Sequence, residues 1–205
     1  MSICLITGRN FMSEKTDRRV RKTRAQLRAG LATLMQKKSI KEITVKELVE
    51  EVDINRSTFY LHYADIYQML ESIENELMDE IQKTIQGHFP SHDAGGSSLE
   101  FAVELLSILY QNKELCMALM GPNGDMVFVG KIEKLVAETV LPDLFRQLST
   151  DPHNMNYLYA FCLNGCVGLI KAWLSGGQQD SPEHMARLIH RVITRYLASN
   201  APELY

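Results

Sequence analysis

Side chains able to bind a polyanion are concentrated in one short stretch, NRSTFYLH at residues 55–62. Its guanidinium, hydroxyl, phenol and imidazole groups donate hydrogen bonds to phosphates and base edges, and a helix beginning at Arg56 would add an N-terminus that favours anions. If that helix runs to about Tyr63, Phe59 faces inward and the polar residues stay exposed. We expect Arg56 to reach a guanine edge and Tyr60 a phosphate. The candidate contacts with nucleic acid are Asn55, Arg56, Ser57, Thr58, Tyr60, Leu61 and His62.

The residues just before this stretch predict the helix and turn that would position it. Thr44 is a good N-cap, and Glu47 three residues later would complete a capping box. Apolar side chains recur at helical spacing from Val45 to about Val52, so one face of this helix can be buried. A polar break at residues 53–55 then separates it from the second helix, which Asn55 can cap. Two residues of this first helix are further candidate contacts, Thr44 and Lys46.

The sequence NRSTFYLHY followed by ADIYQML resembles the recognition helix and the start of the fourth helix in TetR-family transcription regulators. Two positions depart from the family pattern. Asp53 stands where the family usually has Gly, and Asp tolerates this position because it adopts positive φ more readily than most residues. Ile66 stands where the family usually has a Lys that binds a phosphate. The resemblance therefore implies one operator phosphate contact fewer.

Charge is unevenly distributed along the chain. Residues 1–64 carry 13 Lys or Arg against 7 Asp or Glu, and residues 65–205 carry 9 against 18. A basic module joined to an acidic body favours polyanion binding through the N-terminal third, because each Lys or Arg laid on a phosphate releases counterions. We expect a first helix from about Asp17 to Lys38, after a disordered extension over residues 1–12. Its basic first turns contain Lys15, Arg18, Arg19, Arg21, Lys22 and Arg24, of which Arg19 and Lys22 are candidate contacts with DNA.

Composition and motifs exclude several other classes of protein. Of 205 residues, 45% are hydrophobic and 23% charged, as in ordinary soluble proteins, and no run of about 18 apolar residues predicts a membrane span. Four cysteines and the lack of a convincing secretory signal favour a cytoplasmic protein with reduced thiols. No phosphate-binding loop, nucleotide fingerprint, nucleophile elbow or metal-ligand spacing occurs. We therefore expect no enzymatic activity, cofactor, metal site or membrane partner.

The remainder of the chain is predicted to be helical. A long helix from about Asp65 to Gly87 carries a single apolar stripe, and it is the only predicted element with one end in the basic module and the other in the acidic body. No strand pattern appears. The predicted class is all-α with about nine helices, divided into a helix-turn-helix DNA-binding domain at 13–64 and a helical effector-binding and dimerisation domain at 65–205. Further helices are expected at 99–111, 112–120, 125–141, 153–175 and 182–198.

The helix expected at 153–175 is apolar on nearly every side, so it must be covered on every side. A body of this size has few other helices to bury this one, so we expect a second copy of the chain to cover its remaining sides. The phrase CVGLIKAWLSGGQQDSPEHMARLIHRV resembles the two C-terminal helices of the TetR-type dimer interface, and LMGPNGDMVFVGKIEKLV resembles a subgroup that includes dihydroxyacetone-kinase regulators. The candidate interface residues are Gly165, Gly168, Leu169, Trp173, Met185, Leu188, Ile189 and Val192.

Methionine and aromatic side chains are frequent in the acidic body. At any one position such a residue usually belongs to the core. Collectively they could line an adaptable apolar cavity for a small-molecule effector, which is what the family resemblance implies, although the sequence does not name the ligand. The candidate effector-binding residues are Met69, Ile73, Phe101, Tyr110, Met117, Met120, Phe128, Tyr157 and Phe161.

These observations predict a homodimeric, ligand-responsive transcription regulator whose helices at 56–63 read a palindromic operator. We expect a repressor, because repression is commoner than activation among such regulators. One alternative is a co-activator or protein-binding regulator with weak DNA binding, which Ile66 in place of Lys favours. Another is a small-molecule or thiol-redox protein using Cys162 and Cys166, four residues apart on one helix. No His or acidic residue joins these thiols at ligand spacing, so core packing is their expected role.

Overall fold

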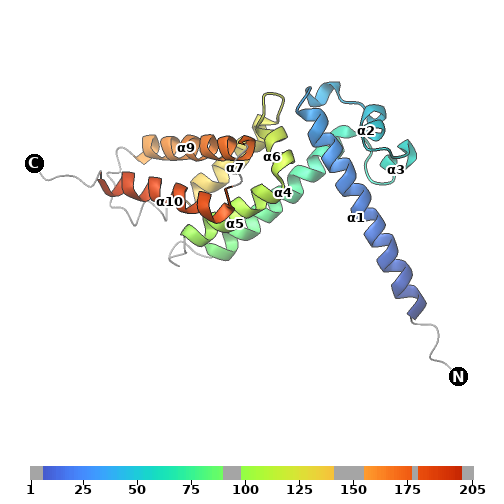
Figure 1. Ribbon diagram of the computed structural model, residues 1–205, viewed down its shortest axis with the longest axis horizontal. Helices are drawn as coiled ribbons and strands as arrows, with labels where there is room; N and C mark the ends of the chain where they lie inside the picture. The colour runs from blue at the N-terminus through green and yellow to red at the C-terminus, as the bar shows by residue number, and fades with distance from the viewer. Residues whose placement is uncertain (1–6, 90–97, 141–154, 177–179, 200–205) are drawn as a thin grey trace, which may run out of the picture.

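The computed structural model describes residues 7–89, 98–140, 155–176 and 180–199. Within these residues every regular element is a helix, which confirms the predicted all-α class. Figure 1 shows α1, α2 and α3 at one end of an elongated molecule, the body at the other, and α4 running between them. The elements are α1 (Thr7–Met35), the 3-10 turn η1 (Ile40–Glu42), α2 (Val45–Glu51), α3 (Arg56–Tyr60), α4 (Ile66–His88), α5 (Ser98–Gln111), α6 (Lys113–Met120), α7 (Met126–Thr139), α9 (Met155–Ser175) and α10 (Pro182–Ser199).

The first three helices pack around a small core at the C-terminal half of α1. α2 passes so close to α1 that a Cβ added at Gly30 would lie 2.3 Å from Cγ1 of Val52 and 3.1 Å from Cδ1 of Leu48. This close approach brings α2, and with it α3, onto one side of α1. The side chains that are fully buried in this core are Leu27, Leu31, Leu48 and Phe59.

Local interactions fix the start of α2 and the turn that follows it. Oγ1 of Thr44 accepts the backbone N–H of Glu47 at 3.2 Å, as predicted. The carboxylate of Glu47 does not complete a capping box, because it accepts a hydrogen bond from Nζ of Lys38 at 2.5 Å instead. A charge-assisted bond of this kind is stronger than a neutral one. Asp53, in the turn, has φ 52°, which confirms the prediction that it occupies a left-handed position.

Two predicted boundaries were wrong. α1 begins at Thr7, although disorder was predicted up to residue 12 and a helix only from about Asp17. The prediction relied on an apolar stripe, whereas straight-chain polar residues form helix without one. α3 ends at Tyr60 rather than near Tyr63, because the backbone N–H of His62 bonds to the carbonyl of Phe59 at 2.9 Å and tightens the last turn.

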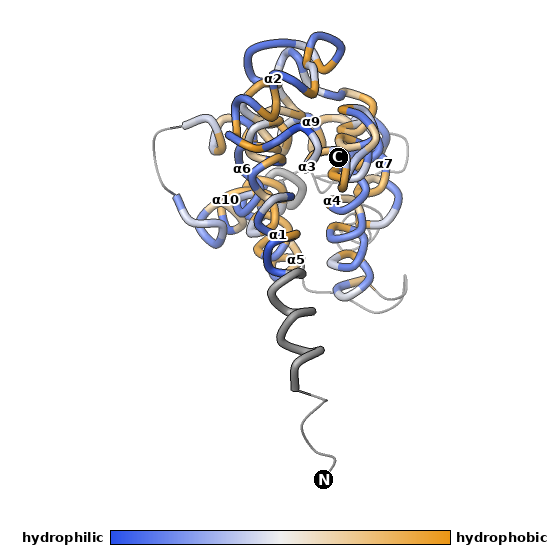
Figure 2. The backbone as a smooth tube through the Cα atoms, turned by 90° about the vertical axis from the view of Figure 1, so that its right-hand side faces the viewer, coloured by the Kyte–Doolittle hydropathy of each residue, from blue (hydrophilic) through white to orange (hydrophobic). Residues whose placement is uncertain are grey.

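α4 confirms the predicted long helix and connects the two ends of the molecule. Oδ1 of Asp65 accepts the backbone N–H of Gln68 at 2.8 Å and caps its first turn. Figure 2 shows hydrophilic and hydrophobic positions recurring along α4, the pattern of a helix with one buried face. The buried side chains of that face include Met69, Ile73, Leu77 and Ile81.

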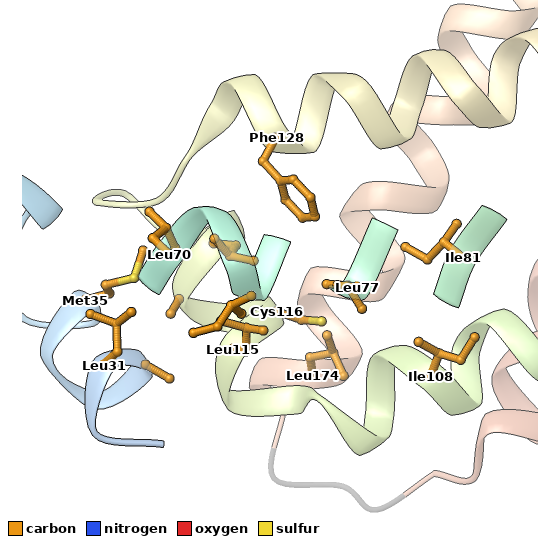
Figure 3. Packing of buried hydrophobic residues seen from close by; sticks show 14 of the residues in the cluster. Leu31, Met35, Leu70, Leu77, Ile81, Ile108, Leu115, Cys116, Phe128 and Leu174 are labelled. Carbon is orange, nitrogen blue, oxygen red and sulfur yellow. The ribbon is translucent and has the colours of Figure 1, made fainter. Parts of the chain in front are cut away.

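A second connection, missed from the sequence, joins the N-terminal helices to the body. The short helix α6 packs along α1, and Leu31 and Met35 of α1 lie near Leu115 of α6 in Figure 3. Nη2 of Arg28 also donates to Oδ1 of Asn112, the residue just before α6, at 2.9 Å. The expectation that α4 alone bridges the two parts is therefore wrong, because tertiary packing brings α6 back against α1.

α5 and α10 form the most extensive helix pair of the body, and α7 and α9 complete it. Most of α9 is exposed or half-buried in the protomer. By length and composition alone, its residues Asn156–Ser175 could cross a membrane, with mean hydropathy 1.3. The sequence prediction of no membrane span used a different criterion. It counted uninterrupted apolar runs, whereas small residues interrupt this stretch and Lys171 is its only charge.

Candidate nucleic-acid interface and ligand cavity

The exposed face of α3 carries the candidate contacts with nucleic acid. Phe59 is fully buried and anchors the helix, while Arg56 is exposed, Tyr60 is 48% exposed and Leu61 is 81% exposed. A large apolar side chain left in water at this position has no partner within the protomer. An arginine, a tyrosine and an exposed leucine side by side could offer a base edge both donors and an apolar contact.

Arg56 and Tyr60 form one unit. Nη2 of Arg56 donates to the hydroxyl of Tyr60 at 3.1 Å, and the guanidinium carbon lies 5.6 Å from the centre of the tyrosine ring. The sequence suggested separate roles, with Arg56 at a base and Tyr60 at a phosphate. Their spacing of four residues on a helix was the signal that could have revealed the pair.

Several other candidates already have structural partners. Oδ1 of Asn55 accepts both the backbone N–H and the hydroxyl of Ser57, each at 2.9 Å, and Thr44 caps α2. Thr58 and His62 are half-buried, with the His62 ring centre 6.3 Å from that of Tyr63. These bonds hold the backbone of the turn and of the first turn of α3 in place.

Basic side chains flank this face. Lys46 is exposed on α2, 3.9 Å from the carboxylate of Glu50, and Arg19 and Lys22 are exposed on α1. At the start of α4, Ile66 is only 4% exposed and belongs to the core, so it cannot replace a phosphate-binding lysine. Tyr67 beside it is 56% exposed, and its hydroxyl is a possible phosphate donor that the sequence prediction overlooked.

Arg24, placed by the sequence in the basic end of the first helix, has a different role. Its Nε donates to the hydroxyl of Tyr63 at 3.0 Å, and its Nη2 donates to Ser72 at 3.3 Å and to Glu76. The hydroxyl of Tyr63 and the carboxylate of Glu76 raise the pKa of the guanidinium above its usual value. Arg24 thus ties α1 to α4 directly behind α3.

The body contains a partly open cavity of about 190 Å³ between α4, α5, α6, α7, α9 and α10. Its wall is almost entirely apolar. Figure 3 shows Leu77 and Ile81 of α4 and Phe128 of α7 converging on this region. Three of the predicted effector-binding residues line the wall, Phe101, Met120 and Phe128.

The other six predicted effector-binding residues lie elsewhere. Met69 and Ile73 are core residues of α4, and Met117 is half-buried outside the cavity wall. Tyr110 stacks on Trp173 with ring centres 5.3 Å apart. Tyr157 and Phe161 are 75% and 59% exposed on the outer face of α9. The prediction selected methionine and aromatic residues by type, whereas the wall consists mainly of leucine, isoleucine and valine chosen by their position on each helix.

Three free thiols also line the cavity, Cys116 from α6 and Cys162 and Cys166 from α9. Burial raises the pKa of Cys116 to about 12 and of Cys166 to about 11, and it raises the pKa of Cys162 as well. Protonated thiols behave as small apolar side chains. In the described part of the chain, no group of three His, Cys, Asp or Glu side chains could hold a metal ion.

Comparisons with known proteins agree with this arrangement. A TetR-type family model described as "Transcriptional regulator C-terminal region" matches residues 96–195. The HTH-type transcriptional regulator YxbF of Bacillus subtilis, itself uncharacterized, is 26% identical over 191 residues, which cover 89% of this chain and 47% of that protein. The chain therefore spans about half the length of this curated relative. Together these matches support a TetR-family transcriptional regulator.

Solved structures share the fold of this chain. A TetR transcriptional regulator from Streptococcus agalactiae matches with a TM-score of 0.53 at 21% identity, covering 88% of this chain and 98% of that one. The dihydroxyacetone kinase operon activator DhaS matches with 0.51 at 15%, covering 85% and 96%. The fatty acid degradation regulator FadR from Bacillus halodurans matches with 0.55 at 9%, covering 83% and 94%. At these identities the likeness extends to the fold alone.

The residues predicted for the dimer interface of this chain fall into two groups. Trp173, Met185 and Ile189 are buried within the protomer, where Nε1 of Trp173 donates to the carbonyl of Asp180 at 2.9 Å. These three side chains are core residues before any partner is added. The predicted interface residues that are exposed or half-buried in the protomer are Gly165, Gly168, Leu169, Leu188 and Val192.

The outer face of α9 combines two exposed aromatic rings with exposed small residues. Beyond Tyr157 and Phe161, a Cβ added at Gly165 or Gly168 would meet no atom within 4 Å. Ala160 and Ala172 are exposed on the same helix. Apolar surface of this extent is typical of an interface with another protein or with a membrane.

Proposed function

We propose that the chain is a homodimeric repressor that acts in the cytoplasm by binding DNA rather than by catalysis, and that a small apolar effector releases it from its operator. Residues 13–64 would form the DNA-binding domain and residues 65–205 the effector-binding and dimerisation domain. The observation that carries the proposal is the capped helix-turn-helix whose second helix leaves Arg56, Tyr60 and Leu61 exposed. Two such helices related by a two-fold axis would read half-sites of a palindromic operator.

A selection from random DNA duplexes tests the proposal directly. The purified full-length protein should enrich a palindromic sequence, and its affinity for that sequence should fall as salt is raised, because phosphate contacts release counterions. Lys134→Ala, which removes an exposed charge from α7 in the body, is the control and should leave affinity unchanged. If no sequence is enriched over the starting pool, the chain does not read DNA by itself.

The effector would act through helices that contact both the cavity and the N-terminal module. α4 and α6 both line the cavity, and α4 continues to α3 while α6 packs on α1. Such coupling is reciprocal: an effector that weakens operator binding tenfold must itself bind about tenfold more weakly to the operator complex. Titration of effector into free and into operator-bound protein measures its affinity for each state. Equal affinities would show that effector and operator binding are not coupled and that the body serves only for dimerisation.

One observation favours a second candidate, a regulator that works mainly through a protein partner. Ile66 is buried, so the start of α4 lacks the basic side chain that TetR-family proteins usually place there. If Tyr67 supplies the missing phosphate contact, Tyr67→Phe should lower operator affinity. The same duplex selection separates the candidates, because a partner-dependent regulator would enrich no sequence on its own.

A further inference from the structure

The described cavity wall carries very few charged or polar side chains. Among the described residues that line it there is no Lys or Arg, and the polar side chains other than thiols are Glu133, His190 and Thr194. The hydroxyl of Thr194 already donates to the carbonyl of His190 at 2.7 Å along its own helix. The described wall therefore offers no Lys or Arg to a ligand, and His190 is its only other basic side chain.

The cysteine side chains do not change this balance. The three lining thiols are protonated at neutral pH because burial raises their pKa. A protonated thiol is a poor nucleophile and carries no charge. The described wall is thus neutral and apolar over nearly its whole surface, with a single carboxylate, Glu133, which would repel an anion.

Size adds a second constraint. The cavity of about 190 Å³ is somewhat larger than a dry apolar cavity of about 150 Å³ that accommodates benzene. A ring system or an alkyl chain therefore fits, whereas a strongly hydrated polar metabolite would lose its hydrogen bonds to water without replacing them. Transfer of an ionised carboxylate into such a site costs far more still.

We infer that the effector is a neutral, hydrocarbon-rich molecule, an alkyl chain or ring system whose polar part is limited to an uncharged group, and that carboxylate ligands are rejected. This inference rests on the proposed function for the effector role, but the chemistry of the cavity stands independently of DNA binding. It separates this chain from regulators of polar metabolites and from those that hold a fatty-acid anion by its head group.

A competition series with one chain length tests the inference. The neutral fluorescent probe N-phenyl-1-naphthylamine is bound to the full-length protein and displaced with 1-decanol, decanoate or decylammonium, each below its aggregation limit. Decanol should displace the probe at concentrations at least about tenfold lower than decanoate, because only decanoate must bury an unpaired charge. Failure of the probe and decanol to bind, or equal or better competition by decanoate, overturns the inference.

A pair of valine variants on α7 locates the binding in the cavity. Val136 lines the cavity, while Val127 is 69% exposed on the same helix and is absent from the wall. Val136→Lys should reduce the preference for decanol over decanoate at least about tenfold, since it supplies the missing cation. Val127→Lys should leave the order unchanged. The same effect in both variants would place the probe outside the cavity and overturn the inference.

A melting curve and a separate measurement of operator affinity distinguish the possible results. If Val136→Lys unfolds, as its melting curve would reveal, the order of the three head groups on the wild-type protein still decides. Operator affinity is measured separately without ligand. Neutral ligands that bind in the predicted order without altering operator affinity support the inference about the cavity and overturn only the proposed release by effector.

Discussion

Asp53 holds a backbone conformation that glycine adopts at lower cost. Its φ of 52° lies in the left-handed region, where a Cβ clashes with the neighbouring carbonyl. We expect Asp53→Gly to raise the free energy of unfolding by about 0.5 to 1 kcal/mol, the relief of strain being partly offset by the greater freedom of glycine in the unfolded chain. Urea denaturation measures the change.

The matched control for that variant is Asp79→Gly, at an exposed position within α4. Glycine inside a helix should lower stability there by about 0.5 to 1 kcal/mol. A loss of stability at both positions would contradict the assignment of positive φ to the turn. The two variants change the same side chain, so only backbone conformation distinguishes them.

Arg56 and Tyr60 should act non-additively on operator binding. Arg56→Ala should cost about 1 to 3 kcal/mol and relax the preference for one base pair. Tyr60→Phe keeps the ring below the guanidinium but loses the hydroxyl that accepts from Nη2 of Arg56. We expect Tyr60→Phe to weaken binding in the wild type and to have much less effect in an Arg56→Ala background.

Fluorescence anisotropy measures the affinity of the wild type, the two single variants and the double variant for the selected operator and for a scrambled duplex. If Tyr60→Phe weakens binding equally with and without Arg56, the tyrosine acts on a phosphate alone, as its sequence position first suggested. Val127→Phe, on an exposed part of α7, controls for non-specific changes.

Predictions that depended on a few neighbouring residues were the reliable ones at this scale. The caps at Thr44 and Asn55 were confirmed because each rests on one side chain and a backbone N–H two or three residues away. Arg24 shows the opposite case, since its partners Tyr63 and Glu76 are far along the chain. No local pattern indicates which distant residues Arg24 will contact.

Helices α1 and α2 meet at Gly30, and their distance depends on the missing side chain. A Cβ there would lie 2.3 Å from Cγ1 of Val52, far inside normal contact, and a valine methyl has little room to move. Gly30→Ala should therefore lower the free energy of unfolding by about 1 to 3 kcal/mol, although alanine is the better helix former. Thermal denaturation of the full-length protein measures it.

Gly87→Ala is the control for helix propensity, because a Cβ at Gly87 in α4 would meet no atom within 4 Å. It should raise stability by up to about 1 kcal/mol. A stabilising Gly30→Ala would mean that α1 and α2 are farther apart than described. Operator affinity of Gly30→Ala then reports how far the spacing of α2 and α3 matters for DNA.

Glu74, between α4 and the start of α7, makes the stability of this contact depend on pH. Burial, and then the carboxylate of Asp125, raise its pKa from 4.5 to about 7, and its Oε1 is buried without a hydrogen-bond partner. The native state therefore binds more protons than the unfolded state between these values. Stability should fall as pH rises from about 4.5 to about 7. Because Glu74 is partly solvated, the loss should be only about 1 kcal/mol.

Glu74→Gln tests this directly. The amide cannot ionise, so the variant should be more stable than wild type at pH 8 and nearly equal to it at pH 5. Glu80→Gln, at an exposed position on the same helix, should leave the pH profile unchanged. An unchanged profile for Glu74→Gln would show that this carboxyl is solvated in the native state. Denaturation at a series of pH values supplies both curves.

Element boundaries and element faces differed in how well they could be predicted. The starts of α4, α5, α6, α7 and α10 were confirmed to within one or two residues, since Pro, Gly and capping residues mark them locally. Which face of each helix lines the cavity could not be predicted. Met69 and Phe128 are equally apolar, yet only Phe128 reaches the cavity, because that choice depends on how six helices pack together.

The dimer proposal makes a prediction for the whole molecule. Gly168 faces open space on α9, so Gly168→Glu should fold normally as a protomer but place a charge in the proposed interface. We expect sedimentation to show a dimer for wild type and a monomer for this variant at micromolar concentration. Gly130→Glu on α7, where a Cβ would also meet no atom within 4 Å, is the matched control and should remain a dimer.

If wild type sediments as a soluble monomer, the palindromic reading of the operator loses its basis. If Gly168→Glu remains dimeric, the interface lies on another face of the body. The variant should also bind a full operator more weakly while binding a half-site as the wild-type protomer does, because α3 is untouched.

α6 sets the distance over which an occupied cavity would have to be sensed. It is eight residues long, with Cys116, Leu119 and Met120 lining the cavity and the helix packed along α1. An α-helix with its side chains is about 10 Å across. The ligand and α1, the helix that supports α3, would therefore be separated only by α6. No relay through the chain is required at that range. A ligand one methylene too large for the cavity would therefore press on α6, which packs against the helix that supports α3.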